Sequence, residues 1–210
     1  MRRVESEDTA VPEDYFGAVR DQEERPELVE GISENLTRRG VAVPWLFGLP
    51  HFRLDTPPSS GDEIQSEYFV ARQDAGAALA AVRGLAGEIA PHLTLTELRT
   101  MEADDFWVSP AAGRESLAIH FTWKNHPDEV FDLLPSIEDA LRPFAARPHW
   151  GKLNRFTPAQ LADVYPQLGA MRELVLRHDP AGKFRNEYLD RALGIEGGGE
   201  LPQVSAPMGA

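Results

Sequence analysis

The sequence has no cysteine among its 210 residues. Disulfide bonds, thiolate nucleophiles and cysteine-based metal sites are therefore excluded, and this absence suits the cytoplasm, where we expect the chain to be. No apolar run approaches about 18 residues, so no membrane-spanning helix is predicted. The N-terminus is acidic within Met1–Asp8 and no apolar stretch follows, so we expect no secretory signal.

Positive charge is also scarce. The sequence has 21 Lys and Arg against 34 Asp and Glu, which gives a net charge of −13 and a pI of about 4.9. Nucleic acids and anionic membrane surfaces attract basic proteins, so neither is an expected partner. The hydrophobic share of 42% is ordinary for a globular protein.

The common catalytic motifs are missing as well. The sequence contains no G-x-S-x-G elbow, no P-loop and no G-x-G-x-x-G, and the three glycines at 197–199 resemble a linker. Its six histidines do not form an H-x-x-x-H pair, so we expect no metal site.

Two stretches have the alternation of β-strands, roughly 93–101 and 115–124. Side chains two residues apart share a face of a strand. In the second stretch one face is therefore apolar, with Leu117, Ile119, Phe121 and Trp123, and the other carries His120 and Thr122. In the first stretch, Glu97 and Arg99 share a face.

If these two strands are neighbours, their polar residues gather on one face of a sheet. A carboxylate, a guanidinium, an imidazole and a hydroxyl would then lie together on a rigid support, which favours a site for a small polar ligand. The alternative is an ordinary solvated face, on which Glu97 and Arg99 form a surface ion pair.

The remaining pattern predicts an α+β fold with a mostly antiparallel sheet covered by helices on one face. We expect a further strand at 62–72, one helix over 73–90, and either two short helices or one kinked helix around Pro135. Further helices are predicted after Pro158, after Pro166 and over 186–193.

The domain organisation follows from composition. Residues 1–43 are predicted to be a partly disordered N-terminal arm, because they are mostly acidic and poor in large apolar groups. Residues 44–195 form the predicted domain, and the Gly- and Pro-rich residues 196–210 form a predicted disordered tail.

Several segments resemble alditol (xylitol) oxidases, which belong to the FAD-linked D-arabinono-1,4-lactone oxidase family of the vanillyl-alcohol oxidase superfamily. The resemblance runs from about Pro44 to Gly194, and the segments that carry it are Trp45–Arg53, Gln65–Phe69, Glu97–Thr100, Ala103–Pro110, His120–Trp123, Arg147–Lys152 and His178–Leu189. The His-Trp-Gly-Lys sequence is shared among the lactone oxidases. The Glu-x-Arg and His-Phe-Thr-Trp sequences point more narrowly to the polyol oxidases.

The resemblance implies a cap-type substrate domain. Family members have an N-terminal half that binds FAD and a C-terminal α+β half that binds substrate, and this chain resembles only the second. It implies the substrate-binding half of an FAD-dependent oxidoreductase that oxidises a polyol CH–OH and reduces dioxygen to hydrogen peroxide. We expect it to work with a separate FAD-binding domain or chain, or to be a truncated form that is inactive alone.

The resemblance also assigns roles to residues. It implies that Glu97, Arg99, Thr122 and Lys152 bind substrate, that Arg99, Lys152 and His120 are catalytic, and that His149 is a candidate for cofactor contact, with packing as the alternative. We expect Lys152 to reach the polar face because Gly151 permits a backbone turn that Trp150 anchors by burial.

Two alternative functions remain open. One is the substrate domain of a D-arabinono-1,4-lactone or other sugar-lactone oxidase. The other belongs to a different class and is a non-catalytic binding or interaction domain that keeps the cap fold.

Overall fold

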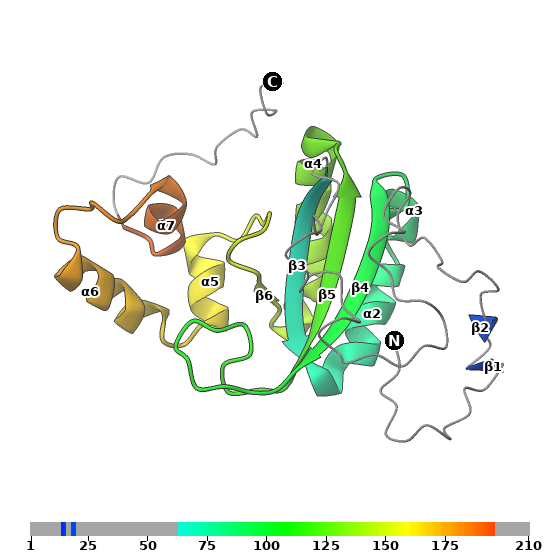
Figure 1. Cartoon of the computed structure of the whole chain (residues 1–210), viewed down its shortest axis with the longest axis horizontal. Helices are drawn as coiled ribbons and strands as arrows, with labels where there is room; N and C mark the ends of the chain where they lie inside the picture. Colours follow the sequence, from blue (N-terminus) through cyan, green and yellow to red (C-terminus); the bar gives the residue numbers. More distant parts are fainter. Residues whose placement is uncertain (1–13, 16–17, 20–62, 196–210) are drawn as a thin grey trace, which may run out of the picture. The chain divides into compact units, whose positions relative to one another are not determined.

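The computed structural model describes residues 14–15, 18–19 and 63–195 (Figure 1). The chain divides into two units, residues 1–61 and 62–210. In the first unit, β1 (Asp14–Tyr15) pairs antiparallel with β2 (Ala18–Val19). Apart from these two short strands, the predicted arm lies outside the described residues, as do the predicted tail and the boundary at residue 43.

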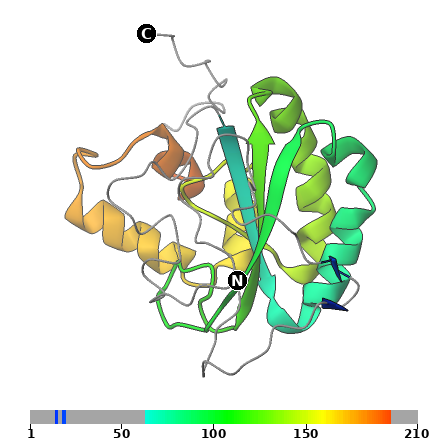
Figure 2. The ribbon, with the colours of Figure 1, turned by 45° about the vertical axis from the view of Figure 1, so that its right-hand side comes forward.

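The second unit is built on a four-stranded sheet with the order β4-β5-β3-β6. Every pairing is antiparallel, which confirms the predicted sheet type (Figures 1 and 2). The strands are β3 (Glu63–Ala71), β4 (Leu93–Met101), β5 (Ser116–Lys124) and β6 (Arg147–Pro148). Because β5 pairs with both β3 and β4, it connects the two long neighbours.

Helices cover one face of this sheet, as predicted (Figure 2). The covering helices are α2 (Ala75–Arg83), α3 (Ala86–Ile89) and α4 (Pro127–Leu141). After β6 follow α5 (Pro158–Val164), α6 (Leu168–His178) and α7 (Glu187–Ala192). No helix in the described ranges has the length and apolar character needed to span a bilayer.

The core lies between the sheet and the helices. The apolar face of β5 packs there as the alternation predicts, with Phe121 and Trp123 stacked at 5.0 Å between ring centroids. The α4 side chains that meet them are Val130, Leu133, Leu134, Ile137 and Leu141. Each large apolar side chain buried in this way contributes about 1.5–3 kcal/mol, so this contact orients the sheet relative to α4.

The opposite face of β5 is not solvated, contrary to that alternative. His120 and Thr122 are only 2% and 4% exposed. The segment after β6 continues beside β3, where the N–H groups of His149 and Leu153 donate to the carbonyls of Glu67 and Gln65, both at 2.9 Å. This segment brings further side chains to the polar face, so β5 is buried on both sides.

One helix prediction needed correction, and one open alternative is decided. The helix expected over 73–90 is divided into α2 and α3 at Gly84 and Leu85, in keeping with the poor helix propensity of glycine. Of the two alternatives left open at Pro135, two short helices or one kinked helix, the structure shows a single helix, α4. Pro135 is exposed, so water can satisfy the carbonyl that loses its hydrogen bond, while the buried side chains hold the helix in place.

A buried carboxyl connects α4 to the sheet. Glu138 Oε1 accepts hydrogen bonds from the Tyr68 hydroxyl at 2.9 Å and from the Arg155 backbone N–H at 2.7 Å. Burial raises the pKa of Glu138 to about 7, although both hydrogen bonds act in the opposite direction. The folded protein therefore keeps the Glu138 proton over a pH range in which the unfolded chain, with a pKa of 4.5, has lost it.

We predict that Glu138→Gln removes a pH dependence from stability. Between pH 4.5 and 7 the folded state binds more protons than the unfolded state, so the contribution of Glu138 to the unfolding free energy falls as pH rises. The fall is about 3 kcal/mol for a shift of this size. Urea unfolding of parent and variant across this window measures it. A constant difference between the two would contradict the raised pKa.

Candidate functional site

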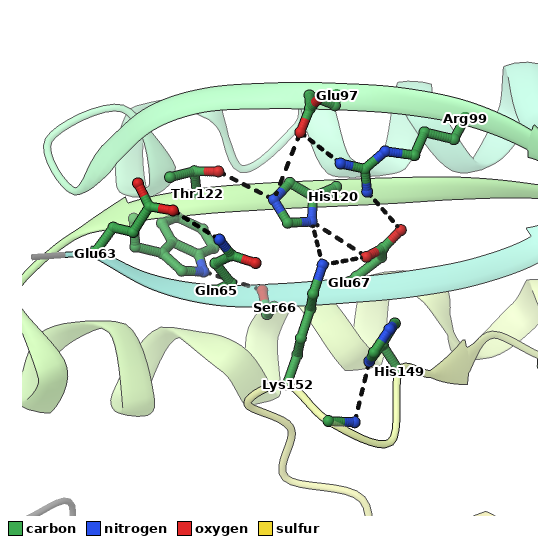
Figure 3. Close-up of polar contacts among 12 residues, drawn as sticks. Glu63, Gln65, Ser66, Glu67, Glu97, Arg99, His120, Thr122, His149 and Lys152 are labelled. Carbon is green, nitrogen blue, oxygen red and sulfur yellow. Dashed lines mark hydrogen bonds and ion pairs between the residues drawn. The ribbon is translucent and has the colours of Figure 1, made fainter. Parts of the chain in front are cut away.

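Strand register brings the predicted polar residues together. His120 of β5 is paired with Glu97 on β4 and with Glu67 on β3, so the three side chains project from the same face. Thr122 is two residues from His120 and Arg99 is two residues from Glu97, so both side chains lie on this face as well. The structure therefore brings Glu97, Arg99, His120 and Thr122 together on one face of the sheet, as the strand alternation predicts, while their role as a site stays a prediction (Figure 3).

Glu67 lies at the centre of the arrangement. Its Oε1 accepts a hydrogen bond from Arg99 Nη1 at 3.0 Å, and its Oε2 accepts one from Lys152 Nζ at 2.5 Å. His120 Nδ1 lies 3.2 Å from the same Oε2. Since the Glu67 side chain is only 5% exposed, two cations compensate a carboxylate that has almost no contact with water.

The charge state of Glu67 follows from these contacts. Burial by itself would raise the pKa of Glu67, but its contact with His120, the hydrogen bond from Lys152 and the charges of Lys152 and Arg99 outweigh it and lower the pKa to about 2. Glu67 is therefore an anion throughout the physiological pH range, and Arg99 and Lys152 are both held against it.

The β4 side of the site is open. Arg99 Nη2 donates to Glu97 Oε2 at 2.6 Å, and both side chains are about 40% exposed, at 39% and 41%. An exposed ion pair of this kind contributes little by itself, as the surface-pair alternative holds. Here, however, the guanidinium also contacts buried Glu67, so the pair continues a buried network to the surface.

His120 links the two carboxylates. Its Nε2 lies 3.0 Å from Thr122 Oγ1 and 3.8 Å from Glu97 Oε2, while its Nδ1 lies 2.8 Å from Lys152 Nζ. Both ring nitrogens therefore have polar partners, and the imidazole is held in one orientation.

Lys152 reaches this face as predicted, and one of the two expected reasons holds. Its backbone N–H closes a turn by donating to the His149 carbonyl at 3.2 Å. Gly151 does not adopt a positive φ, and a Cβ there would make an ordinary contact with the His149 ring at 3.5 Å. Trp150 does anchor the turn, by donating from Nε1 to the Val108 carbonyl at 2.7 Å and packing on the Tyr165 ring at 4.9 Å.

His149 lies beside the network. Its ring stacks on Phe69 at 6.1 Å, and its Nδ1 accepts a hydrogen bond from the Gly151 backbone N–H at 3.0 Å. Burial lowers the pKa of His149, and the positive charge of Lys152 adds to this effect. The structure thus shows the packing contact that was the alternative, and the cofactor role stays a prediction.

Glu67 is not among the site residues that the sequence predicts. The available signal was parity, because Gln65 and Glu67 alternate with buried Ser66 and Tyr68 on β3. That signal places Glu67 on a polar face but does not say which strand lies beside β3.

The arrangement is suited to a neutral molecule with several hydroxyl groups. Arg99 and Lys152 are donors, the Glu97 carboxyl offers acceptor oxygens, and Thr122 can act as both. Among residues 63–195 and the two short strands, no group of three or more His, Asp or Glu side chains could hold a metal ion.

Lys152→Met is predicted to raise the pKa of His149. The ammonium disfavours a second positive charge nearby, so its removal shifts the pKa of His149 back towards 6.5, while burial keeps it from returning fully. An NMR titration of the His149 ring measures the shift. Lys124→Met is the control, because exposed Lys124 donates to the Pro91 carbonyl instead. Equal His149 titration in parent and Lys152→Met would show that the two groups do not interact.

Comparison with known proteins gives a consistent result. Residues 62–192 match the family model of D-arabinono-1,4-lactone oxidase, a range that includes every site residue described above. An alditol oxidase from a Streptomyces species is 43% identical over 158 residues, which cover 75% of this chain and 38% of the relative.

More distant relatives share the same region. L-gulono-1,4-lactone dehydrogenase of Mycobacterium tuberculosis is 32% identical over 133 residues, covering 62% of this chain and 30% of the relative. L-gulonolactone oxidase of Mus musculus is 28% identical over 100 residues, which cover 46% of this chain and 23% of the relative. The chain thus spans well under half the length of these curated relatives.

Proposed function

Because the chain belongs to the D-arabinono-1,4-lactone oxidase family, we propose that it is the substrate-binding part of an FAD-dependent alditol oxidase-like oxidoreductase. The observation that supports this most directly is the convergence of Glu97, Arg99, Thr122 and Lys152 on one face, within the region similar to the Streptomyces alditol oxidase. The cysteine-free, acidic sequence is our reason for proposing a cytoplasmic location.

In the proposed reaction a terminal CH–OH of a polyol becomes an aldehyde. Two electrons and two protons leave the carbinol, and dioxygen takes them up to give hydrogen peroxide. FAD supplies the electron acceptor in such a reaction. The residues of this chain bind the polyol, orient its reacting carbon and stabilise the oxygen as its proton is lost.

Each polar side chain has a proposed role. Arg99 and Lys152 stabilise negative charge on the reacting oxygen, because both are cations that project onto the same face. Glu97 accepts hydrogen bonds from other hydroxyls of the polyol, and its partial exposure leaves it accessible to them. Thr122 is the neutral donor beside His120.

The described residues do not fit the pyrophosphate of FAD. No glycine-rich phosphate-binding loop precedes a helix within residues 63–195. The first turn of α4 has Pro127, which lacks an N–H, and the acidic residues Asp128 and Glu129, which repel an anion. We therefore propose that a separate FAD-binding domain or chain is the partner, and we assign no reaction step to FAD in this chain.

A chimera tests the proposed function. The matching segment of the Streptomyces alditol oxidase is replaced by residues 44–195, and peroxide formation from xylitol is measured. We expect activity that Lys152→Met lowers by roughly 100-fold, the size of effect typical of removing one oxyanion donor. Lys124→Met is the matched control and should not change it. A folded, flavin-loaded chimera without activity would contradict the proposal and favour the non-catalytic binding domain.

The chain alone is predicted neither to hold FAD tightly nor to oxidise a polyol. The described residues provide no pyrophosphate site, and the net charge of −13 disfavours a diphosphate further. Purified chain is mixed with FAD and xylitol, and both bound flavin absorbance and peroxide are followed. Stoichiometric flavin with peroxide production would refute this prediction.

A sugar lactone is the second candidate substrate, and the name of the matching family model favours it. The same chimera distinguishes the two. A higher kcat/KM for L-gulono-1,4-lactone than for xylitol would assign the site to lactones, because the two substrates differ in ring closure and in their hydroxyl donors.

A further inference from the structure

We propose that Glu67 is a positioning residue that holds the Lys152 ammonium against Nδ1 of His120, so that His120 carries its proton on Nε2 and donates it towards Thr122. The inference rests on the proposed function for its catalytic meaning. The tautomer of His120 itself depends only on contacts between residues of this chain.

Glu67 lies between two cations, Arg99 and Lys152. Its two carboxylate oxygens are used separately, one by Arg99 at 3.0 Å and the other by Lys152 at 2.5 Å. Glu67 therefore sets the separation of the two groups proposed to contact the reacting oxygen. Its own backbone is held on both sides, because β3 pairs with β5 and Glu67 O accepts from His149 N at 2.9 Å.

The contacts of His120 Nδ1 indicate whether this nitrogen carries a proton. This nitrogen lies 2.8 Å from Lys152 Nζ and 3.2 Å from Glu67 Oε2. A lysine ammonium has three donors and no acceptor. A proton on Nδ1 would find an acceptor in Glu67 Oε2, the longer contact, but would also face the Lys152 ammonium at the shorter one. A lone pair on Nδ1 instead accepts a hydrogen bond from Lys152 at 2.8 Å, while another ammonium proton is donated to Glu67.

The proton of neutral His120 then belongs on Nε2. There it has an acceptor, Thr122 Oγ1 at 3.0 Å, with Glu97 Oε2 next at 3.8 Å. The buried carboxylate provides the charge that keeps Lys152 in place, so the order of the network is Glu67, Lys152, His120, Thr122. Lys152 donates to Glu67 and to Nδ1 of His120, and Nε2–H of His120 donates to Thr122.

This arrangement changes the role expected of His120. With Nδ1 covered by Lys152 and Nε2 protonated, neither nitrogen is free to remove a hydroxyl proton in the resting site. His120 instead orients Thr122 by donating to it, which leaves the Thr122 hydroxyl hydrogen to point at a bound ligand.

The test reads the tautomer directly in the full chain without cofactor. Histidine labelled with nitrogen-15 distinguishes N–H from lone-pair nitrogens by NMR, and His120→Gln identifies the His120 signals. We expect Nε2 to be protonated in the parent. We expect Lys152→Met to reverse the tautomer, because Nδ1 loses its donor and can then donate to Glu67 Oε2.

Glu67→Gln should shift the tautomer ratio by about tenfold, because Lys152 loses its charge partner. Glu63→Gln is the matched control. Glu63 lies on the same face of β3 and accepts from Gln65 Nε2 at 2.7 Å, but it contacts neither Lys152 nor His120. The control should keep the parental tautomer. If Glu67→Gln does not fold, the tautomers of the parent and of Lys152→Met still test the inference.

A parent with Nδ1 protonated, or with both nitrogens protonated near neutral pH, would overturn the inference. So would a Lys152→Met variant that keeps Nε2–H. The result is separable from the proposed function. Inactive chimeras together with the expected tautomer would refute polyol oxidation alone, and active chimeras with Nδ1–H would refute only the role of Glu67.

Discussion

The pairing of β5 with both β3 and β4 is the constraint on which core and site depend. A strand places alternate side chains on opposite faces, so one register decides both sides at once. With His120 opposite Glu67 and Glu97, the same register directs Phe121 and Trp123 towards α4. A shift of one residue would turn the imidazole into the apolar core and the indole onto the polar face, and the apolar contact with α4 opposes it.

The cost of burying Glu67 is the second constraint. A carboxylate without water is stable only if charges and hydrogen-bond donors compensate it. Here the compensation comes from two cations that are distant in the sequence, Arg99 on β4 and Lys152 after β6. The same contacts that stabilise the fold therefore assemble the cations of the site.

The segment after β6 shows how core and site are connected. Lys152 faces the network, whereas Arg155, three residues later, donates its N–H to buried Glu138 on the helical side of the sheet. Glu138 also accepts from Tyr68, the residue next to Glu67 on β3. A change in the protonation of Glu138 would thus act on the backbone that carries both Glu67 and Lys152, even though Glu138 itself lies in the core.

The sequence by itself determined whatever depends on local periodicity. Alternation identified the two faces of β5, and the shared parity of Glu97 with Arg99 and of His120 with Thr122 was enough to predict their gathering. Resemblance added Lys152 and the family. Tertiary structure alone decided that β3 lies beside β5, which places Glu67 at the centre, and that the polar face is buried at β5 but partly exposed at β4. It also decided that α4 continues through Pro135, because burial of its other face outweighs one lost hydrogen bond. These outcomes depend on contacts between residues far apart in the chain, which no local pattern of side chains specifies.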